Sequence, residues 1–147
     1  MSFLLVPLAL LAGILNTVQS GANATLSKGL GQPVLAALCV TLGNAVVYLL
    51  VGAVLGLRWP DMGKVAQLPW WAWTGGFCGA AYVLAVVFFA EKLGAAVFTG
   101  CTVTAAILTS VLLDHFGLVG FKEHAASLWR LLGCALMIGG LVLIATF

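Results

Sequence analysis

The chain has 147 residues, of which 63% are hydrophobic and 7% are charged, and its formal net charge is +2. Soluble domains carry roughly 25% charged residues, so this chain has too few to give a soluble domain its polar surface. The small net charge and the lack of Lys/Arg clusters argue against a nucleic-acid partner. Together with a mean hydropathy of +1.20, the composition predicts an integral membrane protein.

Five apolar runs are long enough for helices that cross a bilayer, which need about 20 residues each. In chain order, the predicted spans are residues 3–27, 33–57, 70–90, 95–113 and 128–147. The runs are continuous and show no strand-like alternation, so we expect an all-α protein and not a barrel. The connections are short, so residues 1–147 are expected to form a single five-helix transmembrane domain.

The first span is expected to be retained in the mature protein. Ala22-Asn23-Ala24 fits the small-x-small pattern of a signal-peptide cleavage site. However, no basic residue precedes the run, and the run is longer than the apolar part of a signal peptide.

A row of polar residues interrupts this first span. Its members follow helical spacing on one face: Asn16, Gln19, Ser20, Asn23 and Ser27. We call this row the polar stripe. Facing lipid, each unpaired amide would cost roughly 2–7 kcal/mol, so the stripe must face protein or water. It could line a wet substrate path, or it could form interhelical hydrogen bonds, which average about 0.6 kcal/mol in membranes. Three amides on one face favour the path.

Other spans offer possible partners for the stripe. Asn44 and Tyr48 lie in the second span and Tyr82 in the third, where its ring could bond an amide, face a cation or pack in the core. The fourth span has Thr99, Thr102 and Thr109, a weaker signal because threonine often bonds its own helix. The predicted substrate-binding residues are Asn16, Gln19, Ser20, Asn23, Asn44 and Tyr82.

Glycines recur in small-x-x-x-small patterns, which let helix backbones approach closely in membranes. The patterns predict helix packing, without specifying the partner faces, at Gly52, Gly56, Gly75, Gly76, Gly79 and Gly139.

No Asp, Glu, Lys, Arg or His lies near the middle of any predicted span. We therefore expect a neutral binding site; if transport is coupled to protons, Glu91 or Asp114 would have to serve from a helix end. The spans also lack the paired carboxylates, Ser/His pair or metal cluster that an intramembrane hydrolase needs. We expect neither enzymatic activity nor a cofactor.

A metal site is not expected either. The four cysteines lie far apart in separate apolar runs, which favours packing over zinc binding or redox chemistry. His115 and His124 flank a loop beside Asp114 and Glu123, where solvated side chains are a commoner explanation than a metal site.

Five spans place the two termini on opposite sides of the membrane. The N-terminal side, here called side A, holds four basic residues (Arg58, Lys64, Lys122 and Arg130), and side B holds Lys28 and Lys92. This weak bias favours side A in the cytoplasm but would permit both orientations. All five tryptophans belong to side A: Trp59, Trp70, Trp71, Trp73 and Trp129. An antiparallel homodimer would place tryptophans at both interfaces; chance clustering is the alternative.

Several stretches resemble the YdcZ-like inner-membrane proteins, a branch of the drug/metabolite transporter superfamily. They are LAGILNTVQSGANATLSKGLGQP (11–33), WWAWTGGFCGAAYVLAVVFFAEKLGAA (70–96), LLDHFGL (112–118) and RLLGCALMIGG (130–140). The resemblance covers almost the whole chain. It implies a five-helix unit of the bacterial inner membrane, a small-molecule exporter, and pairing of units in inverted orientation.

The resemblance also extends to single positions. Gln19 and Asn23 match polar positions of the family's first helix, and Tyr82 matches a frequent tyrosine. Ala105 and Ala106 stand where the family often has Gly-Gln, which implies a different substrate or a larger role for the polar stripe.

These observations lead us to expect a transporter that moves a small polar or amphipathic solute by alternating access in an antiparallel dimer. The expected partners are the solute, membrane lipids and a second copy of the chain. A passive channel built from an inverted dimer is one alternative. A non-transporting accessory subunit is another, and it would have its stripe sealed by interhelical hydrogen bonds.

Overall fold

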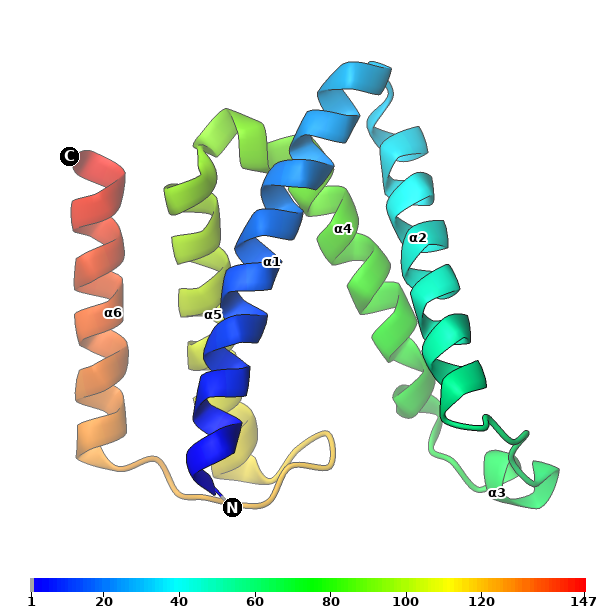
Figure 1. The fold of residues 1–147 in the computed structure, drawn as a ribbon. Helices are drawn as coiled ribbons and strands as arrows, with labels where there is room; N and C mark the ends of the chain where they lie inside the picture. The colour runs from blue at the N-terminus through cyan, green and yellow to red at the C-terminus, as the bar shows by residue number, and fades with distance from the viewer. Residues whose placement is uncertain (1) are drawn as a thin grey trace. The chain divides into compact units, whose positions relative to one another are not determined.

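The computed structural model describes residues 2–147, with side chains from residue 5 onward. The described chain is helical and contains no strand (Figure 1). Its elements are α1 (Ser2–Leu30), α2 (Pro33–Val54), α3 (Met62–Ala66), the 3-10 helix η1 (Trp70–Trp73), α4 (Thr74–Leu93), α5 (Ala95–Phe116) and α6 (Leu128–Thr146).

Five helical segments are long and apolar enough to cross a membrane, which confirms the predicted number of spans. They are Leu5–Leu30, Pro33–Val54, Trp70–Leu93, Ala95–Phe116 and Leu128–Thr146. Large apolar side chains cover their outer surfaces, as expected for helices in contact with lipid.

The second helix is shorter than predicted, because a glycine ends it before residue 57. Gly56 has a φ of +68°, a left-handed conformation that glycine adopts without steric cost. The N–H of Leu57 then donates to the carbonyl of Gly52 at 2.7 Å and closes the helix end. Gly56 therefore ends α2, and its predicted role in helix packing stays a prediction.

The chain separates into two compact units, residues 1–91 and 92–147. We call them unit 1 and unit 2 and describe each by itself. The single five-helix domain remains a prediction.

In unit 1, the helices α1, α2 and α4 meet at one end. Ala36, which is fully buried, packs with Ala37, Val83 and Val87. The Ser27 hydroxyl donates to the Val87 carbonyl at 3.1 Å. We call this end, on the predicted side B, the closed end of unit 1. Away from it, α1 and α2 spread apart (Figure 1).

An ion pair adds to the closed end of unit 1. The Lys28 ammonium lies 2.9 Å from Glu91 Oε1, and both side chains are more than half exposed. A pair so exposed contributes little to stability, typically about 0–1 kcal/mol. The small buried side chains therefore hold this end together more than the charges do.

In unit 2, α5 and α6 pack against each other. A Cβ atom built on Gly100 would lie 2.8 Å from Leu141 Cδ1, so the lack of a side chain here gives room for Leu141 of α6. Asp114 Oδ2 accepts a hydrogen bond from Arg130 Nη2 at 3.0 Å. This ion pair links the end of α5 to the first turn of α6.

The predicted packing glycines have a different environment. A Cβ atom on Gly75, Gly76, Gly79 or Gly139 would meet nothing within 4 Å, and one on Gly52 would touch only the side chain of Leu57. Within the described part of the chain, no helix packs closely against Gly75, Gly76, Gly79 or Gly139. That these glycines pack against a helix of a second chain stays a prediction.

The Ala36→Leu substitution should destabilise the protein, because there is no room for a larger side chain at the closed end. Overpacking of this kind costs typically about 1–3 kcal/mol. The matched control is Ala53→Leu, at an exposed position of the same helix. Thermal unfolding in detergent, followed by circular dichroism, measures the difference; equal melting temperatures for the two variants would contradict the closed-end packing.

Candidate functional site

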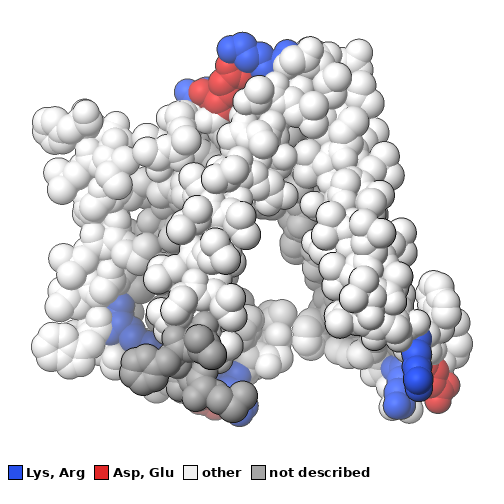
Figure 2. Space-filling view, viewed as in Figure 1, with Lys and Arg blue, Asp and Glu red and all other residues white. Residues whose placement is uncertain are grey.

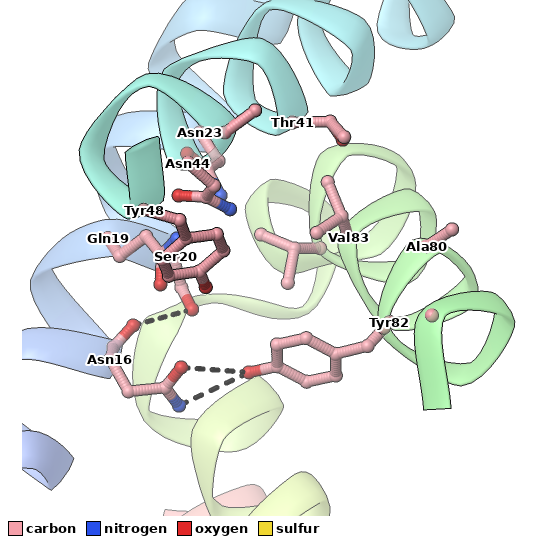
Figure 3. A pocket seen from close by; sticks show the side chains of 14 residues that line it. Asn16, Gln19, Ser20, Asn23, Thr41, Asn44, Tyr48, Ala80, Tyr82 and Val83 are labelled. Carbon is pink, nitrogen blue, oxygen red and sulfur yellow. Dashed lines mark hydrogen bonds between the residues drawn. The ribbon is translucent and has the colours of Figure 1, made fainter. Parts of the chain in front are cut away.

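A cavity of about 690 Å³ lies between α1, α2 and α4 of unit 1. Its volume falls in the range of roughly 300–1,000 Å³ that is usual for small-molecule sites. All six residues predicted to bind substrate line it. The complete lining consists of Asn16, Gln19, Ser20, Asn23, Thr41, Asn44, Ala45, Tyr48, Gly76, Gly79, Ala80, Tyr82, Val83 and Val86 (Figure 3).

The polar stripe of α1, apart from Ser27, forms one wall of the cavity. Ser20 and Asn23 are each only 7% exposed, whereas Val18, on another face of the same helix, is 64% exposed. Ser20 and Asn23 therefore face the interior of unit 1, Gln19 borders the cavity with an exposed side chain, and the apolar face of α1 is left for lipid. This arrangement follows from helical spacing, which places residues three and four apart on one face.

Part of the stripe forms hydrogen bonds within unit 1. Asn16 Nδ2 donates to the Tyr82 hydroxyl at 3.2 Å, and this hydroxyl lies 3.5 Å from Asn16 Oδ1 (Figure 3). The bond joins α1 to α4 across the cavity. The Ser20 hydroxyl donates to the Asn16 carbonyl of its own helix at 2.9 Å. Asn16 and Ser20 thus have partners within the protein.

The other amides of the cavity have no such partners. In Figure 3, the dashed lines join Asn16 to Ser20 and to Tyr82. Within the described chain, the side-chain amides of Gln19, Asn23 and Asn44 make no hydrogen bond. No buried side-chain nitrogen or oxygen of the described residues is sealed off without a partner. The Asn23 amide must therefore reach the cavity surface, although its side chain is largely buried.

The α2 wall carries a second polar row that the sequence analysis did not identify. Thr41, Asn44 and Tyr48 follow spacings of three and four, so they share one face of the helix. Of these, Asn44 was predicted to bind substrate and Tyr48 was named only as a possible partner. The same spacing test that revealed the stripe in α1 would have found Thr41.

The wall formed by α4 is mostly small and apolar. Gly76 and Gly79 line the cavity, and a Cβ atom on either would meet nothing within 4 Å. Ala80, Val83 and Val86 complete this wall. Within unit 1, the two glycines leave room in the cavity instead of bringing helices together.

No Asp, Glu, Lys, Arg or His lines this cavity. The charged groups of unit 1 gather at the ends of its helices, with uncharged surface between them (Figure 2). At the closed end, Lys28 and Glu91 are already paired with each other. The cavity therefore offers amides, hydroxyls and two tyrosine rings, but no fixed charge.

Unit 2 has a smaller groove of about 460 Å³ between α5 and α6. Its lining is mainly apolar, with the Asp114–Arg130 ion pair at one end. Arg130 Nη1 also lies 3.4 Å from the His124 carbonyl, so the guanidinium is engaged on two sides. Of the threonines predicted as weaker candidates in this unit, Thr102 donates to the Thr99 carbonyl of its own helix at 3.0 Å.

The loop histidines of unit 2 interact with the backbone. His115 Nδ1 accepts the N–H of Ala126 at 3.1 Å, and the backbone N–H of His124 donates to the Asp114 carbonyl at 2.7 Å. No group of three or more His, Cys, Asp or Glu side chains in the described part of the chain is arranged to hold a metal ion.

A cysteine on the cavity side of α1 should react with a water-soluble thiosulfonate, because the reactive thiolate forms only where water reaches the sulfur. The four native cysteines are free and would first be replaced by alanine. In native membranes, Gln19→Cys should label at least about tenfold faster than Val18→Cys, whose side chain faces lipid. Equal rates would show that the polar stripe borders no aqueous space.

The sequence model of one family, described as "Putative inner membrane exporter, YdcZ", matches residues 4–143. No curated protein and no solved structure matches the chain. The match covers nearly the whole chain and confirms the resemblance noted in the sequence. With five helices able to cross a membrane, the protein is a multi-pass protein of the inner membrane. The family description supports a membrane transporter and points away from an enzyme. The chain belongs to this YdcZ family of inner-membrane proteins.

Proposed function

We propose that the protein exports a small polar or amphipathic solute, which it binds in the cavity of unit 1. The proposed binding residues are Asn16, Gln19, Ser20, Asn23, Asn44 and Tyr82. The observation that carries this proposal is the group of unpaired amides beside a cavity large enough for a small molecule. Lipid cannot pair with these amides, so water or a solute must do so.

The accessory-subunit alternative is less well supported by the same geometry. A purely structural stripe would have its polar groups closed by interhelical hydrogen bonds. Asn16 and Ser27 do form such bonds, with Tyr82 and Val87. Gln19, Asn23 and Asn44 do not, which is more unpaired polar surface than helix packing requires.

The working form in this proposal is an antiparallel homodimer. The cavity is not enclosed by one chain, since Tyr48 in its lining is 72% exposed. Gly75 and Gly139 likewise have open space beside them, where a second chain could pack. The weak charge bias and the side-A tryptophans are consistent with two copies in opposite orientation.

Alternating access in such a dimer would use the uneven packing of unit 1. In each copy, unit 1 is closed where Ala36, Ala37 and Val87 meet, and its helices α1 and α2 diverge away from that end. In opposite orientations, the two copies would open their cavities toward opposite sides of the membrane. Rocking of one copy against the other would then expose the solute to each side in turn.

Removal of a single cavity amide should abolish export without unfolding the protein. The test expresses each variant in cells that lack their own drug exporters and measures growth against a panel of antibiotics and dyes. Wild type should raise tolerance to at least one compound. Gln19→Ala and Asn23→Ala should lose this effect while reaching the membrane at the wild-type level.

The matched control for this test is Thr25→Ala. Thr25 lies on the same helix outside the cavity, and its hydroxyl donates to the Gly21 carbonyl at 2.9 Å. This variant should keep full tolerance. The proposal fails if wild type protects against no compound, or if the amide variants lose only dimerisation and retain their transport per dimer.

Flux in proteoliposomes separates a transporter from a channel. The identified compound should move at no more than roughly 1–10³ molecules per second, the range of enzyme-like turnover, because each cycle needs a conformational change. A rate many orders of magnitude higher would indicate a pore.

Orientation provides an independent test. C-terminal fusions to green fluorescent protein, active in the cytoplasm, and to alkaline phosphatase, active outside it, should both be active if the chain inserts both ways.

Two variants change the charge bias in opposite directions. One basic residue on side A against two on side B remains after the triple substitution Arg58→Gln, Lys64→Gln and Lys122→Gln. Five on side A against one on side B result from the double substitution Gln67→Lys and Lys92→Gln. These two variants should be fixed in opposite orientations.

Each fixed variant should be inactive alone and active when the two are expressed together, because only the mixture can form antiparallel pairs. Full activity of either variant by itself would exclude the antiparallel dimer. The proposal that the cavity binds the solute would then depend only on the transport activity of the Gln19→Ala and Asn23→Ala variants.

A further inference from the structure

We infer that the cavity of unit 1 selects uncharged solutes that carry a carboxamide or ureido group next to an apolar portion, and that Asn23 is the main contact with this group. The inference deepens the proposed function, since it assumes that this cavity is the solute site. It rests on three features of the cavity: its lack of charge, the unpaired amide of Asn23 and the contrast between its walls.

The lack of charge disfavours ionic solutes. No lining residue carries a formal charge, and at the closed end Lys28 and Glu91 pair with each other at 2.9 Å. An ion that enters the cavity would lose hydration without gaining a counter-charge. This loss is much larger for an ion than for a neutral polar group.

Asn23 determines which neutral group fits. Its side chain is 7% exposed, it lines the cavity, and its amide has no hydrogen-bond partner in the described chain. A carboxamide presents two donors on nitrogen and an acceptor oxygen in one plane. Its closest complement is another planar group with a donor and an acceptor side by side, as in a carboxamide or a urea.

The amides of Gln19 and Asn44 extend this requirement. Both are unpaired in the described chain and line the same cavity, Gln19 from α1 and Asn44 from α2. Asn16 differs, because it is already bonded to Tyr82. Three amides can thus provide both donors and acceptors around one polar group of the solute.

The opposite wall is suited to an apolar portion. Gly76, Gly79 and Ala80 expose little side chain, and Val83 and Val86 add apolar surface. A solute with a polar edge toward α1 and α2 and an apolar edge toward α4 would match both walls. The rings of Tyr48 and Tyr82 could instead attract a cation, so the experiment includes a cationic probe.

Three probes of nearly equal shape differ mainly in charge: benzamide is neutral, benzamidine is a cation and benzoate is an anion. Purified full-length protein in detergent is equilibrated with tritiated benzamide, and the other two compete for binding. Benzamide should bind at least about tenfold more tightly than either ion, since only benzamide pairs with the amides without bringing an unmatched charge.

Asn23→Asp should reverse this order. It keeps the shape of the side chain but adds a carboxylate, so benzamidine should then bind at least about tenfold more tightly than benzamide. Asn23→Leu should lose benzamide binding without gaining benzamidine binding. Thr25→Ala, outside the cavity, should bind all three probes as wild type does.

The wild-type order is a test that needs no variant to fold. Absence of benzamide binding, or equal or tighter binding of either ion, would overturn the inference. So would an unchanged order in a folded Asn23→Asp protein. If export is found but the ions bind best, only this inference fails; if benzamide binds in the expected order but no compound is exported, only the proposed function fails.

Discussion

The need of amide groups for hydrogen-bond partners is the constraint on which the rest of the structure depends. In hydrocarbon, only protein or enclosed water can meet this need. The first helix has polar side chains along one face, and α2 and α4 are placed opposite that face. Asn16 and Ser27 are paired by α4, through Tyr82 and the Val87 carbonyl. The remaining amides are left facing a space that the protein does not fill.

Unit 1 combines this polar face with uneven packing. Its closed end relies on side chains small enough to let three helices touch, namely Ala36 and Ala37 beside Val87. Farther along the same helices, the lining changes to larger polar groups on α1 and α2 and to glycines on α4. One bundle thus contains a tightly packed region and a hollow one. The position of the change is set by side-chain size rather than by a break in any helix.

Much of this arrangement could be predicted from the sequence because it depends on periodicity. The five spans follow from apolar runs, and the inward face of the stripe follows from the spacing of Asn16 to Ser27. Helix ends were less predictable: α2 stops at Val54 because Gly56 adopts a left-handed conformation, although apolar residues continue to Leu57. The helix end is thus determined by the backbone conformation of Gly56 and not by the end of the apolar run.

The meaning of the glycines could not be predicted, since a small-x-x-x-small pattern does not say what lies opposite. Gly100, outside the predicted set, lies against the Leu141 side chain of α6, whereas Gly76 and Gly79 adjoin open space. Thr41 is not recognisable as a lining residue by itself; it stands out only together with Asn44 and Tyr48 on the same face of α2. These features depend on which helix faces which, and that is a property of the tertiary structure.

The empty space beside Gly76 and Gly79 has a consequence for how such a protein can diversify. A methyl group gained at either position would project toward the hollow and meet no other atom of the described chain within 4 Å. A single codon change could therefore narrow the range of molecules that fit, while the closed end and the membrane-crossing helices remain as they are. The size of the hollow could change without altering the amides that border it, because those amides lie on α1 and α2 and the two glycines lie on α4.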